Sequence, residues 1–205
     1  MNYLAHVFLS GSDPELLVGN FIADAVRGKQ ILQFSPGIQR GILLHRAIDH
    51  FTDVHPVVSE TKNRLRPAYG KYAAVIADMY YDHFLAASFP DFSPVSLGTF
   101  TAQTYSVLQQ FWPVLPERVK GFLPHMMQHN WLLSYAQLKG INQALTGLSR
   151  RTTFISGMET AAAELAKNYE LYQAEFRVFM PELIAFSANW IRENRNLQPD
   201  PGVSV

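Results

Sequence analysis

Histidine and aspartate, two side-chain types that commonly hold catalytic metal ions, gather in the first part of this chain. Five of the seven histidines and seven of the eight aspartates fall within the first 91 of 205 residues. His45 and Asp49 are four residues apart in a predicted helix, and Asp53 continues the same face by one turn. Asp78 and Asp82 repeat this spacing in another predicted helix. These two rows are the first candidates for a chemical site.

Asp24 is a third candidate, because its neighbours between Phe21 and Val26 are apolar. A carboxylate in apolar surroundings is costly to desolvate, so it usually finds a cation, a metal or hydrogen-bond donors. Several carboxylates converging with imidazole, and no sulfur, suit Mn, Fe, Zn or Mg. Such a metal supports hydrolysis of a phosphate ester, because it lowers the pKa of a bound water and neutralises phosphoryl oxygens. Arg46 or Arg27 would add a bidentate phosphate contact.

Structural roles explain part of the same pattern. Asp13 is expected to cap the first predicted helix, and Asp53 to cap the helix that begins near residue 56. A His-x-x-x-Asp spacing also arises by chance and then forms a surface ion pair. Other histidines are assigned to solvated helix ends (His50 and His55) or to packing (His125 and His129).

Helix signals recur along the chain and position these candidates. A capping residue before a proline opens helices at Pro14 and Pro36, and apolar residues then follow at spacings of three and four. No stretch alternates with a period of two, so the predicted fold is all-α, a single-domain helical bundle over residues 1–196 with a flexible tail at 197–205. Helices are predicted over 14–27, 35–53, 56–66, 71–87, 93–112, from 116 with a break at Pro124, over 134–150, and from 156 with a kink at Pro181.

Composition limits the classes of partner. The 17 basic and 17 acidic residues cancel, so no net field draws the chain to nucleic acid or to an anionic membrane. The absence of cysteine excludes disulfides and thiolate metal sites. No apolar run approaches the roughly 20 residues that cross a bilayer. We therefore expect a soluble, cytoplasmic protein with no nucleic-acid or membrane partner.

Several short segments occur in a recognisable order and spacing. They are Met1–His6, Gly19–Asp24 with Arg27-Gly28, Gly41-Ile42 with His45–Asp49, Thr52-Asp53, Asp78 and Tyr81–Leu85. Together they resemble the acyl carrier protein phosphodiesterase family over about the first 90 residues. The resemblance implies removal of the 4'-phosphopantetheine arm from holo acyl carrier protein, with a divalent metal, manganese being expected. It also implies kinship with the all-helical HD-domain phosphohydrolases, although Arg46 rather than an aspartate follows His45.

The resemblance also yields a hypothesis for the active site. The predicted metal ligands are His6, Asp24, His45, Asp49, Asp78 and Asp82, with His6 and Asp78 in supporting roles. The predicted catalytic residues are Asp24, Asp49, His83 and Arg46. A metal-bound water would attack the phosphodiester, and His83 is the candidate acid for the leaving serine oxygen of the carrier protein.

The proposed partner is acidic, as carrier proteins are, so a neutral enzyme needs a local basic rim. The predicted substrate-binding residues are Arg27, Lys29, Arg40, Arg64 and Arg66. Each of them is equally compatible with ordinary solvated surface.

Two other functions fit the same residues. The first is a metal phosphohydrolase that acts on a small phosphoester or a nucleotide. The second is a non-catalytic helical binding module whose histidines and aspartates form a structural ion-pair network. An assay on holo carrier protein and a nucleotide panel separates the first alternative, and metal analysis with stability measurements separates the second.

Overall fold

The computed structural model describes residues 1–195, and within them every regular element is a helix, which confirms the all-α prediction. The α-helices are α1 (Tyr3–Phe8), α2 (Pro14–Ile22), α3 (Pro36–Val54), α4 (Pro56–Tyr69), α5 (Ala73–Ala87), α6 (Leu97–Gln110), α7 (Glu117–Gln128), α8 (Trp131–Ser134), α9 (Leu138–Ser149), α10 (Ala161–Lys167) and α11 (Tyr169–Glu193). The 3-10 helices are η1 (Ala23–Ala25), η2 (Gly28–Gln33), η3 (Gly70–Tyr72), η4 (Phe89–Asp91), η5 (Trp112–Val114) and η6 (Met158–Thr160). The predicted tail, residues 197–205, lies outside the described part of the chain.

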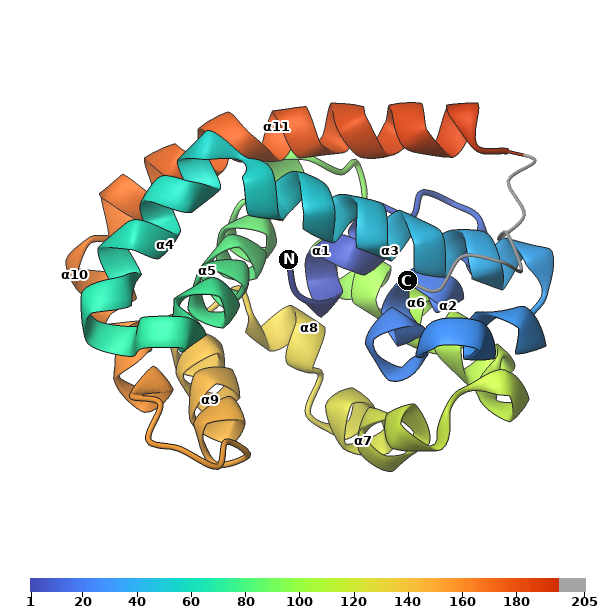
Figure 1. The fold of residues 1–205 in the computed structure, drawn as a ribbon, viewed down its shortest axis with the longest axis horizontal. Coiled ribbons are helices and arrows are strands. Elements are labelled where there is room, and N and C mark those ends of the chain that lie inside the picture. The colour runs from blue at the N-terminus through green and yellow to red at the C-terminus, as the bar shows by residue number, and fades with distance from the viewer. Residues whose placement is uncertain (196–205) are drawn as a thin grey trace.

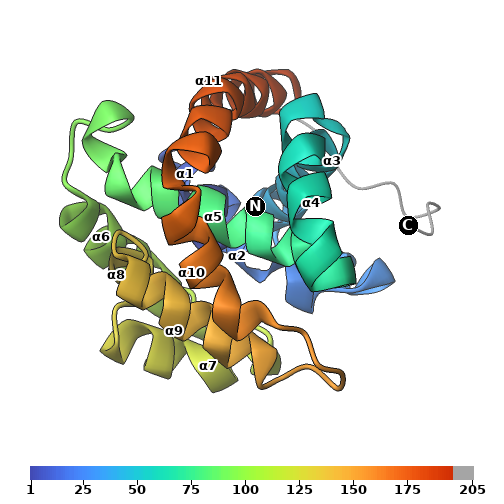
Figure 2. The ribbon, with the colours of Figure 1, turned by 90° about the vertical axis from the view of Figure 1, so that its left-hand side faces the viewer.

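Two opposite sides of the molecule are joined by a central helix. The long helix α11 runs along one edge, across α3 and α4, while α7 and α9 lie at the opposite edge (Figure 1). Figure 2 shows the same separation from the side, with α5 between the two edges. Helix α5 contacts α1, α4, α9 and α11, so it links the N-terminal helices to the rest of the fold.

Helix α3 carries one of the candidate rows and has clear local causes. Pro36 occupies the first helical turn, where its missing N–H costs no hydrogen bond. The helix ends at Val54, because His55 precedes Pro56 and takes the extended backbone that a following proline favours. Ile42 and Ile48 are fully buried on its inner face. The predicted limits of this helix, 35–53, therefore agree closely with the structure.

Two glycines bring α2 and α3 into close contact. A Cβ on Gly19 would lie 2.1 Å from the Ile38 carbonyl oxygen, and a Cβ on Gly41 would lie 2.4 Å from the Leu16 carbonyl oxygen. Any side chain at either position would force the two helices apart. This contact places Asn20, the residue after Gly19, against the middle of α3.

Several predicted boundaries are wrong. Helix α2 ends at Ile22, so Asp24 lies in η1 rather than in the predicted helix 14–27. Helix α1 has no counterpart among the predicted helices. Residues 134–150 form the end of α8 and then α9, with a break between them. The predicted starts at 93 and 71 are early, since α6 begins at Leu97 and α5 at Ala73.

Internal prolines interrupt the chain less than expected. Helix α7 continues through Pro124, and α11 continues through Pro181. Pro181 lies on the exposed side of α11, while Phe179 and Leu183 on either side are buried. Packing of the buried face therefore holds the helix together where the proline removes a backbone hydrogen bond. The break falls instead at Asn168, between α10 and α11.

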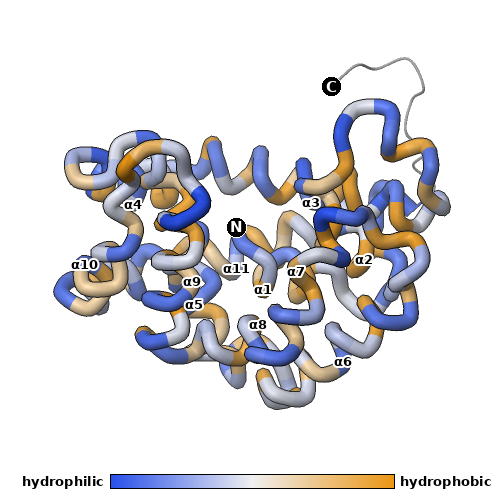
Figure 3. The backbone as a smooth tube through the Cα atoms, turned by 90° about the horizontal axis from the view of Figure 1, so that it is seen from below, coloured by the Kyte–Doolittle hydropathy of each residue, from blue (hydrophilic) through white to orange (hydrophobic). Residues whose placement is uncertain are grey.

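Hydrophobic and hydrophilic stretches are interspersed along the helices, as Figure 3 shows. The buried side chains form one continuous core that includes residues from α1 to α11. Among residues 1–195, no helix combines the length and the hydropathy needed to cross a membrane.

Candidate metal centre and adjoining cavity

Three side chains from α1 and α3 converge beside the start of the chain. One ligand atom from each of His6, His45 and Asp49 lies within 4.8 Å of the other two. Nε2 of His6 is 3.2 Å from Asp49 Oδ1, and Nε2 of His45 is 3.1 Å from Asp49 Oδ2. The two imidazole rings stack with centroids 3.9 Å apart. Asp24 adds a second carboxylate, with its Oδ1 3.4 Å from His45 Nε2.

Asn20 orients both histidines. The Nδ1 of His6 lies 2.8 Å from Asn20 Oδ1, and the Nδ1 of His45 lies 2.9 Å from the Asn20 backbone oxygen. The side-chain amide of Asn20 donates to the His6 carbonyl and to Ser10 Oγ, which assigns Oδ1 as the acceptor. Each imidazole therefore donates through Nδ1, which turns its Nε2 toward Asp49. Metal-binding histidines are held by this kind of outer hydrogen bond.

If both rings were neutral, the two Nε2 atoms and the carboxylate oxygens of Asp49 would all be acceptors. Acceptors that face one another at 3.1–3.2 Å need a cation between them, either a proton or a metal ion. His6 and His45 are nearly buried, with exposed fractions of 3% and 6%, while Asp49 is partly open to solvent. The donor set fits a divalent metal with nitrogen and oxygen ligands.

Electrostatics separate the two histidines. Burial and the neighbouring His45 lower the pKa of His6 to about 4, so His6 is neutral near pH 7. Burial also opposes the charged form of His45, but hydrogen bonds to Asp24 and Asp49 prevail and raise its pKa to about 9. Burial would raise the pKa of Asp49, yet the hydrogen bonds from both histidines hold it well below its usual range. Without a metal, His45 is therefore charged near pH 7 and holds a proton on Nε2 between Asp24 and Asp49, at the position that a metal ion would otherwise occupy.

Asp24 is far more exposed than its sequence suggests. Its side chain is 71% accessible, because η1 turns it away from the apolar residues around it. The hydrogen bond with His45 lowers its pKa. The expectation of a carboxylate trapped in apolar surroundings is wrong, although the structure does bring Asp24 to the edge of the centre.

Asp78 and Asp82, the row on α5, have different surroundings. Asp78 Oδ1 lies 3.1 Å from the amino nitrogen of Met1, which is also 3.7 Å from Asp49 Oδ1, so Asp78 borders the centre. Asp82 is completely buried and accepts hydrogen bonds from the backbone N–H groups of Asn2, Leu4 and Ala5. Its carboxylate thus anchors the first turn of α1 and is not part of the converging group. Burial raises the pKa of Asp82 to about 7, against the amide donors that lower it.

His83 is held in place through both ring nitrogens. Nδ1 lies 2.7 Å from the Tyr135 carbonyl oxygen, and Nε2 lies 3.0 Å from the Tyr169 hydroxyl. Burial lowers its pKa. Its hydrogen bonds go to α11 and to the segment after α8, not to the converging histidines.

A cavity of about 780 Å³ adjoins the centre. Met1, Asp24 and Asp78 line one part of it, and residues of α5, α7, α8 and α9 and of the segment after α9 line much of the rest. His125 and His129 are exposed and line this cavity, with ring centroids 4.2 Å apart, and His125 also packs edge-on against Trp131, in line with its predicted packing role.

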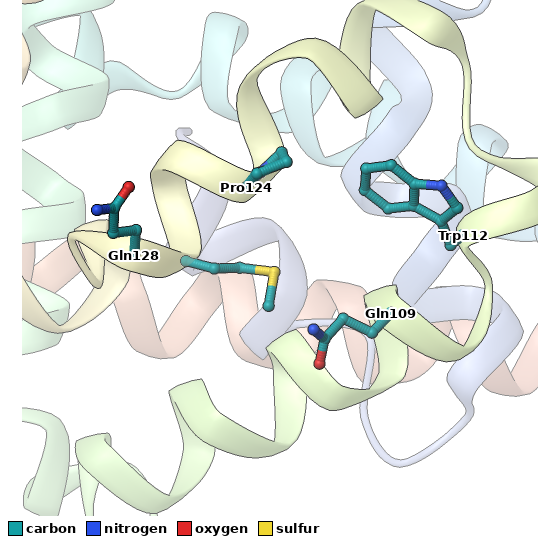
Figure 4. A pocket seen from close by; sticks show the side chains of 5 residues that line it. Gln109, Trp112, Pro124 and Gln128 are labelled. Atoms are coloured by element: carbon teal, nitrogen blue, oxygen red, sulfur yellow. The ribbon is translucent and has the colours of Figure 1, made fainter.

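A second cavity, of about 630 Å³, lies between α6 and α7 (Figure 4). Its lining residues are Gln109, Trp112, Pro124, Met127 and Gln128. None of these side chains is titratable, so this cavity offers no acid, base or metal ligand.

The predicted basic rim does not surround the large cavity. Arg40 donates to the Asn194 carbonyl oxygen and Arg64 donates to Glu175, so both tie other helices to the α11 end of the fold. The other predicted rim residues, none of which lines either cavity, are Arg27, Lys29 and Arg66. Arg46, a predicted catalytic residue, lines neither cavity either. The arginines that do line the large cavity are Arg118 and Arg151, which sequence reasoning missed. Their positions, after residue 110, gave no local signal of proximity to Asp24.

Some of the predicted structural roles are confirmed and others are wrong. Asp13 Oδ1 accepts from the backbone of Glu15 and Leu16, which confirms the predicted cap of α2. Asp53 does not cap α4 and instead pairs with Lys62 at 2.8 Å. Other outcomes are that His50 is exposed, as expected, and that His55 lies at a helix end but is buried.

Comparison with known proteins assigns the chain to a family. The model of the family described as acyl carrier protein phosphodiesterase matches residues 1–183. A relative from Serratia proteamaculans, named acyl carrier protein phosphodiesterase, is 31% identical over 90% of this chain and 96% of its own length. A relative of the same name from Photorhabdus laumondii is 30% identical over 92% and 96%. No solved structure matches, and the relation to HD-domain phosphohydrolases stays a prediction.

The matched region contains the converging histidines, the large cavity and the segments on which the resemblance rests, so the predicted resemblance is confirmed. The chain belongs to the acyl carrier protein phosphodiesterase family.

Proposed function

We propose that this protein hydrolyses the phosphodiester between 4'-phosphopantetheine and the serine of holo acyl carrier protein, and that the reaction requires a divalent metal, with manganese expected. One observation carries the proposal. Asn20 holds both Nδ1 atoms of His6 and His45, so that both Nε2 atoms face Asp49. This arrangement lies within a family whose relatives carry the name of that reaction.

The residues divide into ligands and supports. His6, His45 and Asp49 would hold the metal, and Asp24 would complete the set from the open side. When bound there, a divalent metal supplies charge neutralisation at the phosphoryl oxygens and acidifies a water. Asn20 would fix the tautomer and the ring orientation of both histidines. Asp24, which is open to solvent and next to the cavity, is placed to accept a proton from an attacking water.

His83 takes a different role in this proposal from the one predicted. Its ring already has a hydrogen-bond partner at each nitrogen, so we assign to the leaving serine oxygen the proton that Asp24 would take from the attacking water. The hydrogen bond to the Tyr135 carbonyl instead fixes a residue that lines the large cavity. We assign His83 to support of the cavity wall, and Asp82 to support of the helix that carries His6.

The test is a mass measurement of holo-to-apo conversion of acyl carrier protein. Purified protein is stripped with a chelator, assayed, and assayed again after Mn²⁺ is restored, with a nucleotide panel in parallel. We expect conversion only with the metal and release of one phosphopantetheine for each carrier protein. Hydrolysis of nucleotides but not of holo carrier protein would favour the small-phosphoester alternative. Absence of bound metal, together with no metal-induced rise in stability, would favour the non-catalytic ion-pair network.

A further inference from the structure

The large cavity reaches well beyond the proposed metal centre. Asp24 and Asp78 line it next to the centre, whereas Thr152 and Met158 line it beyond α9. Its volume, about 780 Å³, falls within the range of roughly 300–1,000 Å³ that is typical of small-molecule sites. A cavity of this size admits a flexible chain but not a folded domain. The part of it remote from the metal centre has no function in the hydrolytic step itself.

The lining of the cavity combines apolar side chains and uncharged polar groups with two aspartates, two arginines and two histidines. Val75, Met79 and Leu148 contribute apolar side chains, while Ser134 and Gln143 contribute hydrogen-bonding groups. Such a lining suits a narrow, uncharged arm that contains amides and aliphatic carbons.

Positive charge lies in the wall of the same cavity. Arg118 donates weakly to the Asp24 carbonyl oxygen, at 3.4 Å, which places α7 beside the metal centre. Arg118 and Arg151 both line the cavity, Arg118 next to Asp24 and Arg151 just after the end of α9. Neither arginine forms an ion pair with a carboxylate within residues 1–195, and both are exposed. Guanidinium groups bind phosphate oxygens well.

We propose that this cavity binds the pantetheine arm of the substrate along α8 and α9, and that Arg118, which lies beside Asp24, holds the phosphate together with Arg151, which follows α9. This inference rests on the proposed function. It explains how a chain with no net charge selects one phosphodiester, because the arm, rather than the surface of the carrier protein, would make the specific contacts. The predicted surface cations have no part in this recognition.

Two glycines provide a matched test. Gly147, in α9, lines the cavity, and Gly121, in α7, does not. A Cβ added at either position would have no heavy atom within 4 Å, so Gly147→Leu and Gly121→Leu each add a side chain without a clash at the Cβ. Both changes replace a helical glycine and should preserve the fold. Only Gly147→Leu would fill the cavity.

The measurement is calorimetric binding of free pantetheine and of 4'-phosphopantetheine to the metal-loaded protein. We expect Gly147→Leu to weaken binding of both ligands at least about tenfold, while Gly121→Leu binds them like the parent. We also expect Arg118→Ala with Arg151→Ala to remove most of the preference for the phosphorylated ligand and to change pantetheine affinity little, with Arg27→Ala as the control. Circular dichroism verifies that every variant is folded.

The outcomes for the cavity and for the proposed reaction are separable. If the parent converts holo carrier protein but Gly147→Leu and Gly121→Leu bind both ligands equally, the arm site is wrong and the proposed reaction stands. If the parent binds phosphopantetheine, loses that binding in Gly147→Leu, and fails to convert holo carrier protein, the arm site stands and the proposed reaction is wrong. If Arg118→Ala with Arg151→Ala loses affinity for pantetheine and for 4'-phosphopantetheine by the same factor, the assignment of the two arginines to the phosphate is wrong.

Discussion

The aspartate row on α3 and the aspartate row on α5 have the same spacing but different surroundings. On α3, Asp49 is partly exposed and faces the Nε2 atoms of His6 and His45. On α5, Asp82 is completely buried and accepts three backbone N–H groups from the start of the chain. A carboxylate that faces lone pairs attracts a cation, whereas one that faces N–H donors is already satisfied.

The comparison shows that spacing alone does not distinguish a ligand from an anchor. Helical periodicity puts Asp78 and Asp82 on one face just as it does His45 and Asp49. The neighbouring segment decides the outcome, because α1 brings His6 to one row and its unpaired N–H groups to the other. The short helix α1 therefore supplies a metal-ligand candidate to the row on α3 and hydrogen-bond donors to the row on α5.

The largest effect is expected at Asp49. We expect Asp49→Ala to lower the rate of conversion of holo carrier protein by more than about 100-fold. Mutation of a residue that only hydrogen-bonds to a metal ligand already lowers metal affinity or activity roughly 10–100-fold, and Asp49 would contact the ion directly. Far-UV circular dichroism should show unchanged helix content. Asp53→Ala, one turn further along α3, is the control. Activity of Asp49→Ala within a fewfold of the parent would remove the row on α3 from the chemistry.

The next effect is expected at Asn20. Asn20→Ala removes the Oδ1 acceptor of His6 and the donor to its carbonyl, but keeps the backbone acceptor of His45. We expect Mn²⁺ affinity or turnover to fall roughly 10–100-fold, measured by calorimetry and by the mass assay. A variant with unchanged metal affinity would mean that the orientation of His6 does not matter.

A moderate effect on stability is expected at Asp82. Asp82→Asn leaves a single oxygen for three N–H donors and brings an NH₂ group among them. We expect the free energy of unfolding in urea to fall by about 1–3 kcal/mol, the typical cost of leaving buried polar groups unpaired. Asp91→Asn, at an exposed position, serves as the control. No loss of stability would show that the row on α5 does not anchor α1.

The smallest effect is expected at Asp53. Its ion pair with Lys62 leaves the Asp53 side chain 70% exposed. Exposed pairs contribute about 0–1 kcal/mol, so Asp53→Ala should lower the free energy of unfolding by no more than that and leave turnover unchanged. A loss of turnover like that of Asp49→Ala would extend the functional row along the whole face of α3.

The sequence predicted the fold well where local signals act. Prolines at helix starts and apolar residues at helical spacing predicted α3 within one or two residues of its ends. Helix α1 escaped prediction because it is only six residues long and its first turn is held by Asp82, which is 78 residues from Leu4. Pro181 was misjudged because the packing of Phe179 and Leu183 outweighs a local breaker.

The candidate site was predictable only in part for the same physical reason. The pairing of His45 with Asp49 follows from helix geometry within one element. The contribution of Asn20 depends on the close approach of α2 and α3 at Gly19 and Gly41, which no local pattern reveals. Arg118 contacts Asp24 although the two residues are 94 apart in sequence, so the arginines of the cavity could not be predicted from local patterns.

The central claim is that the row on α3 binds the metal and the row on α5 does not. Calorimetric titration of Mn²⁺ into the metal-free parent, Asp49→Asn and Asp82→Asn tests it most directly, at a temperature where all three are folded. We predict that Asp49→Asn loses at least about 100-fold in affinity, while Asp82→Asn stays within about tenfold of the parent. The reverse order, with affinity lost in Asp82→Asn and kept in Asp49→Asn, would contradict the account.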